Sequence, residues 1–267
     1  MPVIRTPAEL RSFYSSIKSA NGGRWFNFEP IIQAVYEAVL SKGDSAIDAG
    51  AHRGLHTLPM ARRVGTAGSV VAIEPILKLV WLLSMRIRIE APHLAAVVRV
   101  IETAISRFKG SADFLLASEP AYSGLQPRVY PPDVTTRTVR VEVDTLDNLC
   151  SDLERLRFIK LDLEGGEFDA MQGGAGLIRK HRPVLVFEYD VHRTPAFYGF
   201  GHQDLLDFFA ELDYDLIDVL GVPFDRADLW TSAKVWYYFA IPREQRPHAS
   251  ILNAIEAAAG QYLRPSF

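Results

Sequence analysis

Acidic side chains stand where the apolar runs of this sequence end. They are Asp48, Glu74, Glu102, Asp162, Glu164 and Glu188. If the runs are parallel strands, their carboxyl ends meet at one edge of a sheet, which is where open α/β sheets bind ligands. A carboxylate beside a half-buried crevice is costly unless a cation or a hydrogen-bond donor faces it. The spacing therefore predicts a site for a ligand that brings positive charge or hydrogen-bond donors.

The stretch "SAIDAGAHRGLHTLPMA", residues 45–61, is typical of the strand, turn and helix that open a nucleotide-binding unit. A dinucleotide site would show G-x-G-x-x-G, but His52 stands where the second glycine would be. Asp48 would repel a phosphate, whereas it suits an ammonium group or ribose hydroxyls. S-adenosylmethionine has both and no phosphate, and Gly50 and Gly54 would let its methionine part lie against bare backbone. The alternative is a tight turn in which Asp48 only caps the helix.

Glu74 ends the next apolar run, "SVVAIEP", and lies 20 residues after Gly54. At about this separation an acidic side chain reaches the ribose hydroxyls of a bound nucleotide. An ionised carboxylate is suited to a diol because it only accepts hydrogen bonds. Pro75 then ends the strand and is expected beside the same ligand. The alternative is a glutamate that is merely solvated at the strand end.

The adenine is expected near the end of the third strand, around Glu102, Thr103 and Ala104, because the strand order places this edge beyond the ribose site. Asp162, at the end of a central strand, is expected to face the transferred methyl group. The predicted cofactor-binding residues are Asp48, Gly50, His52, Gly54, Glu74, Pro75, Glu102, Thr103, Ala104 and Asp162.

The stretch "KLDLEGGE", residues 160–167, predicts the catalytic residues. Asp162 and Glu164 would share one strand face, where a carboxylate can orient or deprotonate an acceptor hydroxyl. They could also hold a divalent metal such as Mg²⁺, although a metal is not favoured. His192, after the fifth strand, is a candidate general base. The alternatives are that Glu167 only begins a helix and that Glu164 only pairs with Lys160.

Composition narrows the class of protein. The chain has 267 residues, 48% of them hydrophobic, and a net charge of −3 from 29 basic and 32 acidic residues. The chain lacks the excess of basic residues that would indicate a nucleic-acid partner. No apolar run reaches the roughly 18 residues of a membrane helix. One cysteine, Cys150, allows no internal disulfide. We expect a cytoplasmic protein that acts on a small-molecule partner. The protein could form an oligomer.

Strand-like and helix-like patterns alternate along the chain, which predicts an α/β fold with a mostly parallel sheet. Strands such as "VVAI" and "VLVF" are continuously apolar, as expected when helices cover both faces of the sheet. Residues 97–105 are expected to form one strand and residues 166–181 one helix. Residues 214–221 and 235–241 are expected to pair as a closing antiparallel hairpin.

These motifs, taken in order, resemble the FkbM-type S-adenosylmethionine-dependent methyltransferases. The likeness extends from Ser45 to Glu188 and includes "AIDAGAHRGLHTLPMARRVGTAGSVVAIEP", "TAISRFKGSADF", "VEVDTLDNL" and "FIKLDLEGGEFDAMQGGAGLIRKHRPVLVFE". His52 replaces a common asparagine, and Ile73 replaces a common phenylalanine. The resemblance implies a class I methyltransferase (Rossmann-like) fold, with a seven-stranded sheet whose last strand is antiparallel. It also implies O-methylation, often of sugar or natural-product hydroxyls.

The sequence thus predicts an enzyme that methylates a hydroxyl of a small molecule. Residues 45–267 would form the methyltransferase domain, and residues 1–44 a helical and aromatic segment that could cover the substrate. An N-methyltransferase and a non-catalytic S-adenosylmethionine-binding partner protein are the alternatives. A nicotinamide oxidoreductase is disfavoured by Asp48 and by the missing middle glycine.

Overall fold

The computed structural model describes residue 12 and residues 27–189, 198–224 and 235–261. Seven strands form the main sheet, in the order β3-β2-β1-β7-β8-β10-β9. Strand β10 is antiparallel to both of its neighbours, and the other pairs are parallel. The strands are β1 Ser45–Ala49, β2 Ser69–Ile73, β3 Val98–Ile101, β7 Leu156–Leu161, β8 Val184–Glu188, β9 Tyr214–Asp218 and β10 Tyr237–Pro242. The predicted seven-stranded, mostly parallel sheet with a closing antiparallel hairpin is confirmed.

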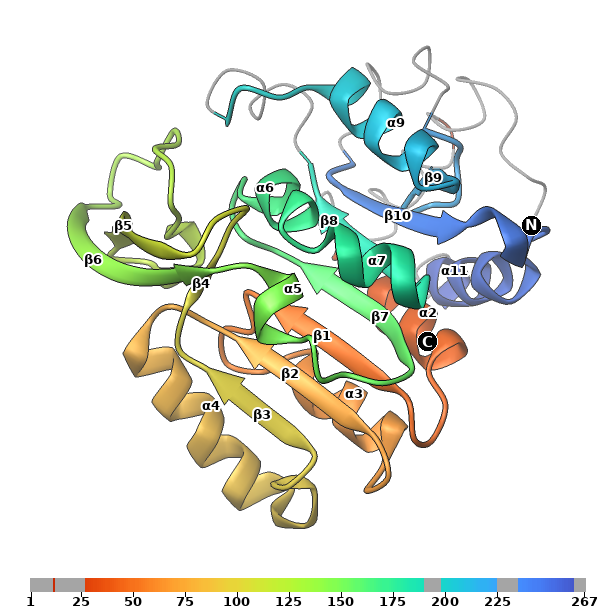
Figure 1. Ribbon diagram of the computed structural model, residues 1–267, viewed down its shortest axis with the longest axis horizontal. Coiled ribbons are helices and arrows are strands. Elements are labelled where there is room, and N and C mark those ends of the chain that lie inside the picture. The colour runs from red at the N-terminus through yellow and green to blue at the C-terminus, as the bar shows by residue number, and fades with distance from the viewer. Residues whose placement is uncertain (1–11, 13–26, 190–197, 225–234, 262–267) are drawn as a thin grey trace.

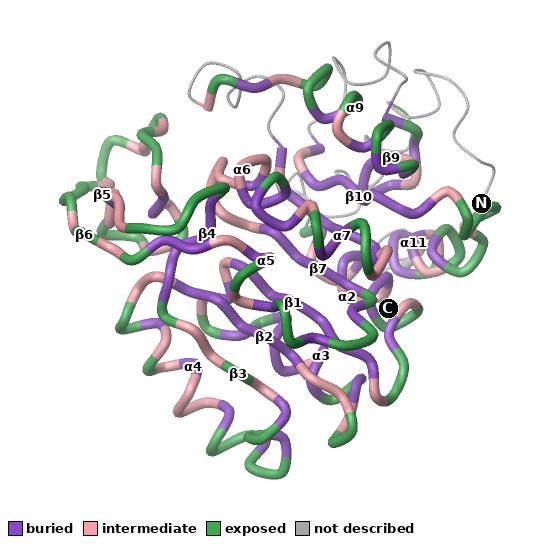
Figure 2. The backbone as a smooth tube through the Cα atoms, in the orientation of Figure 1, coloured by how far each residue is buried: buried purple, intermediate pink, exposed green. Residues whose placement is uncertain are grey.

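Helices cover both faces of this sheet (Figure 1). The core on one face includes side chains from α2 Glu29–Val39, α3 Thr57–Val64, α4 Leu77–Glu90 and α11 Ala249–Gln261. The core on the other face includes side chains from α5 Leu146–Leu149, α6 Glu167–Gln172, α7 Ala175–His181 and α9 His202–Glu211. Short 3₁₀ turns lie at Pro92–Leu94, Pro120–Tyr122 and Arg243–Gln245. Strand β1 is buried along its whole length, and β7 at every position except Arg157, because both faces of these central strands are covered (Figure 2).

A second, three-stranded sheet lies beyond the carboxyl ends of the main strands (Figure 1). It has the order β4-β6-β5, with β4 Ala104–Ile105, β5 Gly110–Ala117 and β6 Thr136–Asp144. The prediction of one strand over residues 97–105 is therefore wrong. The chain changes sheets after Ile101, and the Thr103 hydroxyl donates a hydrogen bond to the Glu142 carbonyl at 3.1 Å. Residues 118–135 connect β5 to β6, and we call them the β5–β6 loop.

The prediction of one helix over residues 166–181 is also wrong, because the chain forms α6 and then α7. Gly173 separates them at a point of close contact, where a Cβ atom would lie 2.3 Å from the Ser106 carbonyl oxygen. Helix α7 then begins against Asp147, whose carboxylate accepts hydrogen bonds from the Gly176 and Leu177 amides at 3.0 and 2.7 Å. Asp147 thus satisfies amides at the start of a separate helix.

The structure describes only part of residues 1–44, the predicted N-terminal segment. Residues 1–11 and 13–26, on which the predicted substrate cover depends, lie outside the described residues. Helix α2 packs into the same core as the main sheet through buried side chains such as Ile31 and Val35. No helix in the described part of the chain combines the length and apolar character that a membrane span requires.

Candidate functional site

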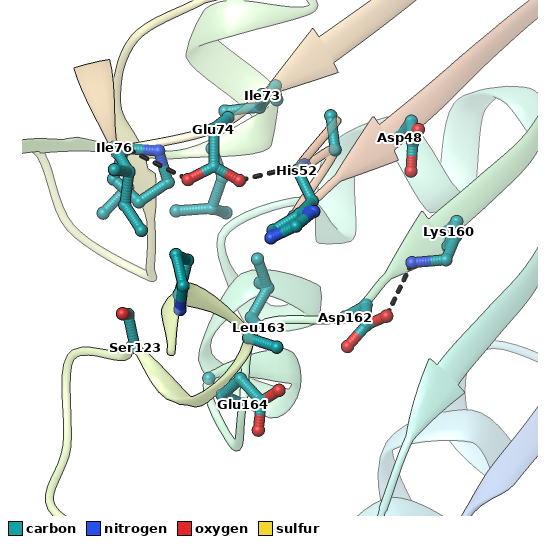
Figure 3. A pocket seen from close by; sticks show the side chains of 18 of the residues that line it. Asp48, His52, Ile73, Glu74, Ile76, Ser123, Lys160, Asp162, Leu163 and Glu164 are labelled. Atoms are coloured by element: carbon teal, nitrogen blue, oxygen red, sulfur yellow. Dashed lines mark hydrogen bonds and ion pairs between the residues drawn. The ribbon is translucent and has the colours of Figure 1, made fainter. Parts of the chain in front are cut away.

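A cavity of about 260 Å³ opens at the carboxyl ends of β1, β2 and β7, with part of its wall formed by the β5–β6 loop. It brings together most of the residues predicted from the sequence. Those that line it are Asp48, Gly50, His52, Glu74, Pro75, Thr103, Ala104, Asp162 and Glu164. Figure 3 shows Glu74 and His52 on one side of this cavity and Asp162 and Glu164 on another.

Gly50 lets the ends of β1 and β7 approach each other. Its φ is +77°, and a Cβ atom there would lie 1.9 Å from the Asp162 carbonyl oxygen. No other residue type avoids both the left-handed conformation and this collision. Gly54 also has a φ of +77°, but it packs against Leu83 of α4 and does not line the cavity.

Asp48, in β1, presents one carboxylate oxygen that the described residues leave unpaired. The side chain is 1% exposed. Its Oδ2 accepts a hydrogen bond from the Thr57 hydroxyl at 2.6 Å, and its Oδ1 is buried without a hydrogen-bond partner among the described residues. A buried unpaired acceptor is costly, so this oxygen is suited to a donor that a ligand brings.

Glu74 follows β2 and is held in place by backbone amides. One carboxylate oxygen accepts from the His52 amide at 3.0 Å and the other from the Ile76 amide at 2.9 Å. Burial raises the pKa of Glu74 to about 7, although these hydrogen bonds act in the opposite direction. Each oxygen retains a lone pair, so the ionised carboxylate can accept two further hydrogen bonds from a diol.

His52 lies in the turn between β1 and α3 and lines the cavity (Figure 3). Its backbone has a φ of +48°, and its Nε2 atom is buried without a partner among the described residues. Burial, together with the charge of Arg53, lowers the pKa of His52. The imidazole is therefore neutral at physiological pH and offers one polar ring atom to a ligand.

The segment that follows β3 contributes Thr103 and Ala104 to the cavity wall. Both residues are buried, and the apolar side chains of Ile76 and Phe114 also line the cavity. Glu102 is exposed and is not among the lining residues. The predicted adenine site at this edge therefore has two of its three residues at the cavity.

Asp162 follows β7 and is held by one side chain of β7 itself and by one from β10. Its Oδ2 accepts hydrogen bonds from Lys160 Nζ at 2.8 Å and from the Tyr237 hydroxyl at 3.1 Å. Burial acts to raise the pKa of Asp162, but the charge and hydrogen bond of Lys160 outweigh it, and the pKa lies below its usual value. Asp162 is therefore ionised. Neither Lys160 nor Tyr237 contacts its other carboxylate oxygen, Oδ1.

Glu164 differs from the sequence prediction in conformation and in partner. Strand β7 ends at Leu161, so Glu164 lies in a turn with a φ of +56° and does not share a strand face with Asp162. Its carboxylate forms an ion pair with Arg128 of the β5–β6 loop. The alternative in which Glu164 only pairs with Lys160 is wrong, because Lys160 pairs with Asp162.

Glu188, at the end of β8, completes a group of three carboxylates. Oxygen atoms of Asp162, Glu164 and Glu188 all lie within 4.8 Å of one another. Burial, with the nearby charges of Asp162 and Glu167, raises the pKa of Glu188 well above its usual value. Three oxygen ligands at this spacing could hold a divalent cation. Lys160 and Arg128, however, already neutralise two of the three carboxylates.

Glu167 begins helix α6 and stabilises the turn before it. Its buried carboxylate accepts hydrogen bonds from the Leu163 amide at 2.6 Å and the Gly165 amide at 3.3 Å. Burial raises its pKa to about 7 despite these bonds. This geometry agrees with the alternative in which Glu167 only begins a helix.

Some residues at the cavity were not singled out from the sequence. Glu29 and His56 both line it, and Glu29 lies outside the motifs. Arg128, which contacts Glu164 without itself lining the cavity, lies in a loop with no charge pattern of its own, so no sequence signal predicts this contact. His192, the predicted general base, lies outside the described residues.

The cavity wall and the side chains in contact with it form two parts with different chemistry. We call Asp48, His52, Glu74, Thr103 and Ala104 the β1–β2 half, and Asp162, Glu164 and Glu188 with Arg128 the β7–β8 half. Glu188 and Arg128 contact this second half but do not themselves line the cavity. The first offers acceptors to an ammonium group and a diol and has apolar walls for a flat base. The second offers carboxylates that can orient a nucleophile or accept its proton.

Comparison with known families gives one match. The sequence profile of the methyltransferase FkbM domain matches residues 48–216, which is more than half of the chain. This match includes every residue of the two halves defined above, and it confirms the resemblance found in the sequence. A comparison with curated proteins gave no match.

Solved structures similar to this chain include a crystal structure of a methyltransferase FkbM from Methylobacillus flagellatus KT. That pair has 18% identity and a TM-score of 0.44, over 87% of this chain and 60% of that one. A putative rRNA methylase from Clostridium thermocellum has 13% identity and a TM-score of 0.46, over 82% and 98%. Aeropyrum pernix fibrillarin, with bound S-adenosyl-L-methionine, has 13% identity and a TM-score of 0.40, over 79% and 73%. The chain thus spans 60% of the length of the first of these proteins.

Proposed function

The chain belongs to the FkbM methyltransferase family, whose members depend on S-adenosylmethionine, and from this premise we propose that it transfers a methyl group to a hydroxyl of a small molecule. The acceptor would be of the sugar or natural-product type. The observation that carries the proposal is the group of three carboxylates, Asp162, Glu164 and Glu188, within 4.8 Å of one another, of which Asp162 and Glu164 line the cavity. A hydroxyl is a poor nucleophile until its proton is removed, and carboxylates can remove it.

The residues of the β1–β2 half fit S-adenosylmethionine. The unpaired Oδ1 of Asp48 suits the ammonium group of the methionine part, and the amide-held carboxylate of Glu74 suits the ribose diol. Thr103 and Ala104 supply a buried wall for the adenine. When bound, the cofactor supplies a methyl group activated by its sulfonium sulfur.

Asp162 and Glu188 would divide the work on the acceptor. Asp162 is held ionised by Lys160 and Tyr237, which makes it a fixed hydrogen-bond acceptor that orients the hydroxyl. Burial raises the pKa of Glu188, so its ionised form would be a stronger base than that of Asp162. Glu164, with His192 as the other predicted candidate, would complete the acceptor site.

We do not propose a required metal. Lys160 and Arg128 already supply two positive charges to the β7–β8 half, and a divalent cation would have to compete with both ion pairs. The proposal also includes a role in natural-product biosynthesis and a cover over the acceptor formed by residues 1–44. The biosynthetic role and the cover are both proposed from the sequence.

Two measurements on the purified protein test the proposed function. The first compares the rise in melting temperature caused by S-adenosylhomocysteine with that caused by NADH, and we expect a rise with S-adenosylhomocysteine alone. A rise with NADH alone would support the oxidoreductase alternative instead. The second measures transfer of a radiolabelled methyl group to a panel of hydroxylated metabolites and to matched amines. Transfer to amines alone would contradict the hydroxyl specificity, and cofactor binding without any transfer would support the non-catalytic alternative.

A further inference from the structure

Glu29 reaches the cavity from outside the matched part of the chain. It is the first residue of α2 and lies 19 residues before Asp48, whereas the family match begins at residue 48. Its side chain lines the cavity together with Asp48, Lys160 and Asp162. The side chain is 31% exposed, so it is open to a ligand and is not enclosed in the core.

A buried histidine holds Glu29 in this position. His56 is 5% exposed, and its Nε2 contacts a carboxylate oxygen of Glu29. Its Nδ1 lies 3.4 Å from the hydroxyl of Tyr36, which is on α2 as well. The imidazole is therefore fixed at both nitrogens by α2. Pro30 follows Glu29 in the first turn of α2, where its fixed φ favours the start of a helix.

Negative charge is in excess around this part of the cavity. The carboxylates of Glu29, Asp48 and Asp162 face one lysine, Lys160, and the imidazole of His56. Burial acts to lower the pKa of Lys160, but these three carboxylates outweigh it and hold its pKa above the usual value. Lys160 is thus charged and is engaged with Asp162. The three carboxylates outnumber this one lysine, so a ligand cation would be stabilised here.

The unpaired oxygen of Asp48 indicates where that cation would lie. Asp48 is 1% exposed and its Oδ1 has no hydrogen-bond partner among the described residues. An alkyl ammonium group has three N–H donors, as many as a lysine side chain, and one acceptor cannot satisfy it. Glu29 and Asp48 line the same cavity and come from different elements, so they can approach one ammonium from two directions.

We propose that Glu29 is a cofactor-binding residue that, together with Asp48, binds the ammonium group of the cofactor's methionine part, and that His56 is the residue that positions it. This inference rests on the proposed function. It assigns to α2 a direct part in selecting an amino-acid-bearing nucleoside over a nucleoside that lacks the amine.

Three ligands separate this role from a general effect on the cavity. S-adenosylhomocysteine carries both the ammonium and the carboxylate, S-adenosyl-3-thiopropylamine carries the ammonium alone, and 5′-methylthioadenosine carries neither. Calorimetry on Glu29→Gln should show affinity about 10- to 100-fold weaker for the first two ligands, because a hydrogen bond to a charged group is lost. Affinity for 5′-methylthioadenosine should stay within about twofold of wild type, which would also show that the variant is folded.

The matched control is Glu37→Gln, on the same helix, where the exposed carboxylate contacts Gln33. It should change none of the three affinities. Equal losses for all three ligands with Glu29→Gln would overturn the inference, as would no loss for any, or a loss for S-adenosylhomocysteine alone. If wild-type protein binds none of the three ligands, the proposed function fails instead.

Discussion

The two halves of the cavity hold their carboxylates in different ways. In the β1–β2 half, Glu74 is held by two backbone amides, and Asp48 is held by Thr57 of the adjacent helix. In the β7–β8 half, two side chains hold Asp162. Lys160 lies two residues before it, and Tyr237 of β10 lies 75 residues after it.

This difference indicates what each half is built to bind. A carboxylate held by backbone amides, as that of Glu74 is, keeps its position whatever side chains surround it, which suits a cofactor that never changes. A carboxylate held by side chains from the β5–β6 loop or from β10 can be re-aimed by substitution. That arrangement suits an acceptor that differs between relatives with the same fold.

The largest expected effect is on catalysis by the β7–β8 half. Asp162→Asn keeps the shape and removes the charge, so turnover on the acceptor should fall about 10²- to 10⁴-fold. Its affinity for S-adenosylhomocysteine should change much less, because the proposed contact is to the acceptor. Steady-state rates and calorimetry measure the two effects. Asp133→Asn, at an exposed site in the β5–β6 loop, is the control. Wild-type turnover in Asp162→Asn would remove this residue from the mechanism.

The next effect concerns the contact between the halves. Gly50→Ala places a Cβ atom against the Asp162 carbonyl and also strains the backbone, so we expect a loss of at least about 3 kcal/mol in unfolding free energy. Gly199→Ala is the control, because Gly199 has a φ of +71° with nothing within 4 Å of its Cβ position. It isolates the backbone strain, about 1–2 kcal/mol. Equal losses in urea unfolding would mean that the close approach at Gly50 has no energetic weight.

A smaller effect is expected from the β1–β2 half. Glu74→Gln removes the charge of the carboxylate that is proposed to accept hydrogen bonds from the ribose hydroxyls. Calorimetry should therefore show that S-adenosylhomocysteine binds about 10- to 100-fold more weakly. Glu102→Gln alters the carboxylate at the next strand end, which is exposed and does not line the cavity. We expect it to bind like wild type. The reverse result would place the ribose or adenine beside Glu102 instead.

The pH dependence of cofactor binding should follow Glu74. Its pKa is about 7 without ligand, and binding requires the ionised carboxylate, so protonation at lower pH competes with the ligand. Affinity for S-adenosylhomocysteine should therefore fall about tenfold between pH 8 and pH 6. His52 has a lowered pKa and should stay neutral over most of this range. Calorimetry at several pH values checks this, and an equally steep dependence in Glu74→Gln would assign the proton to another group.

The smallest expected effect is that of metal removal. Because Lys160 and Arg128 already neutralise two carboxylates of the β7–β8 half, EDTA should change turnover by less than about twofold. The measurement is the rate of methyl transfer before and after treatment and after addition of Mg²⁺. Loss of activity with EDTA and its return with Mg²⁺ would make Asp162, Glu164 and Glu188 metal ligands.

The sequence predicts the β1–β2 half better than the β7–β8 half for a physical reason. Gly50, His52 and Glu74 lie in or beside turns, where local backbone geometry decides which atoms face the crevice. Glu102 shows the limit of that reasoning, because the change of sheets after Ile101 leaves its side chain exposed.

Apart from Lys160, the partners of the β7–β8 half come from distant parts of the chain, and no local pattern predicts them. Arg128 reaches Glu164 across 36 residues, and Tyr237 reaches Asp162 across 75. The same holds for Glu29 and His56, which meet because α2 packs beside α3. The mostly parallel sheet was predictable because apolar periodicity is local, whereas its seven strands were what the family resemblance implied. The break between α6 and α7 was not, because it depends on the contact of Gly173 with Ser106.

The central claim is that the two halves bind the two substrates of a methyl transfer on either side of Gly50. The most direct measurement is a crystal structure with S-adenosylhomocysteine. We predict the ribose hydroxyls on Glu74, the adenine beside Thr103 and Ala104, and the sulfur facing Asp162. A base far from Thr103 and Ala104, or a ribose that does not contact Glu74, would contradict the account.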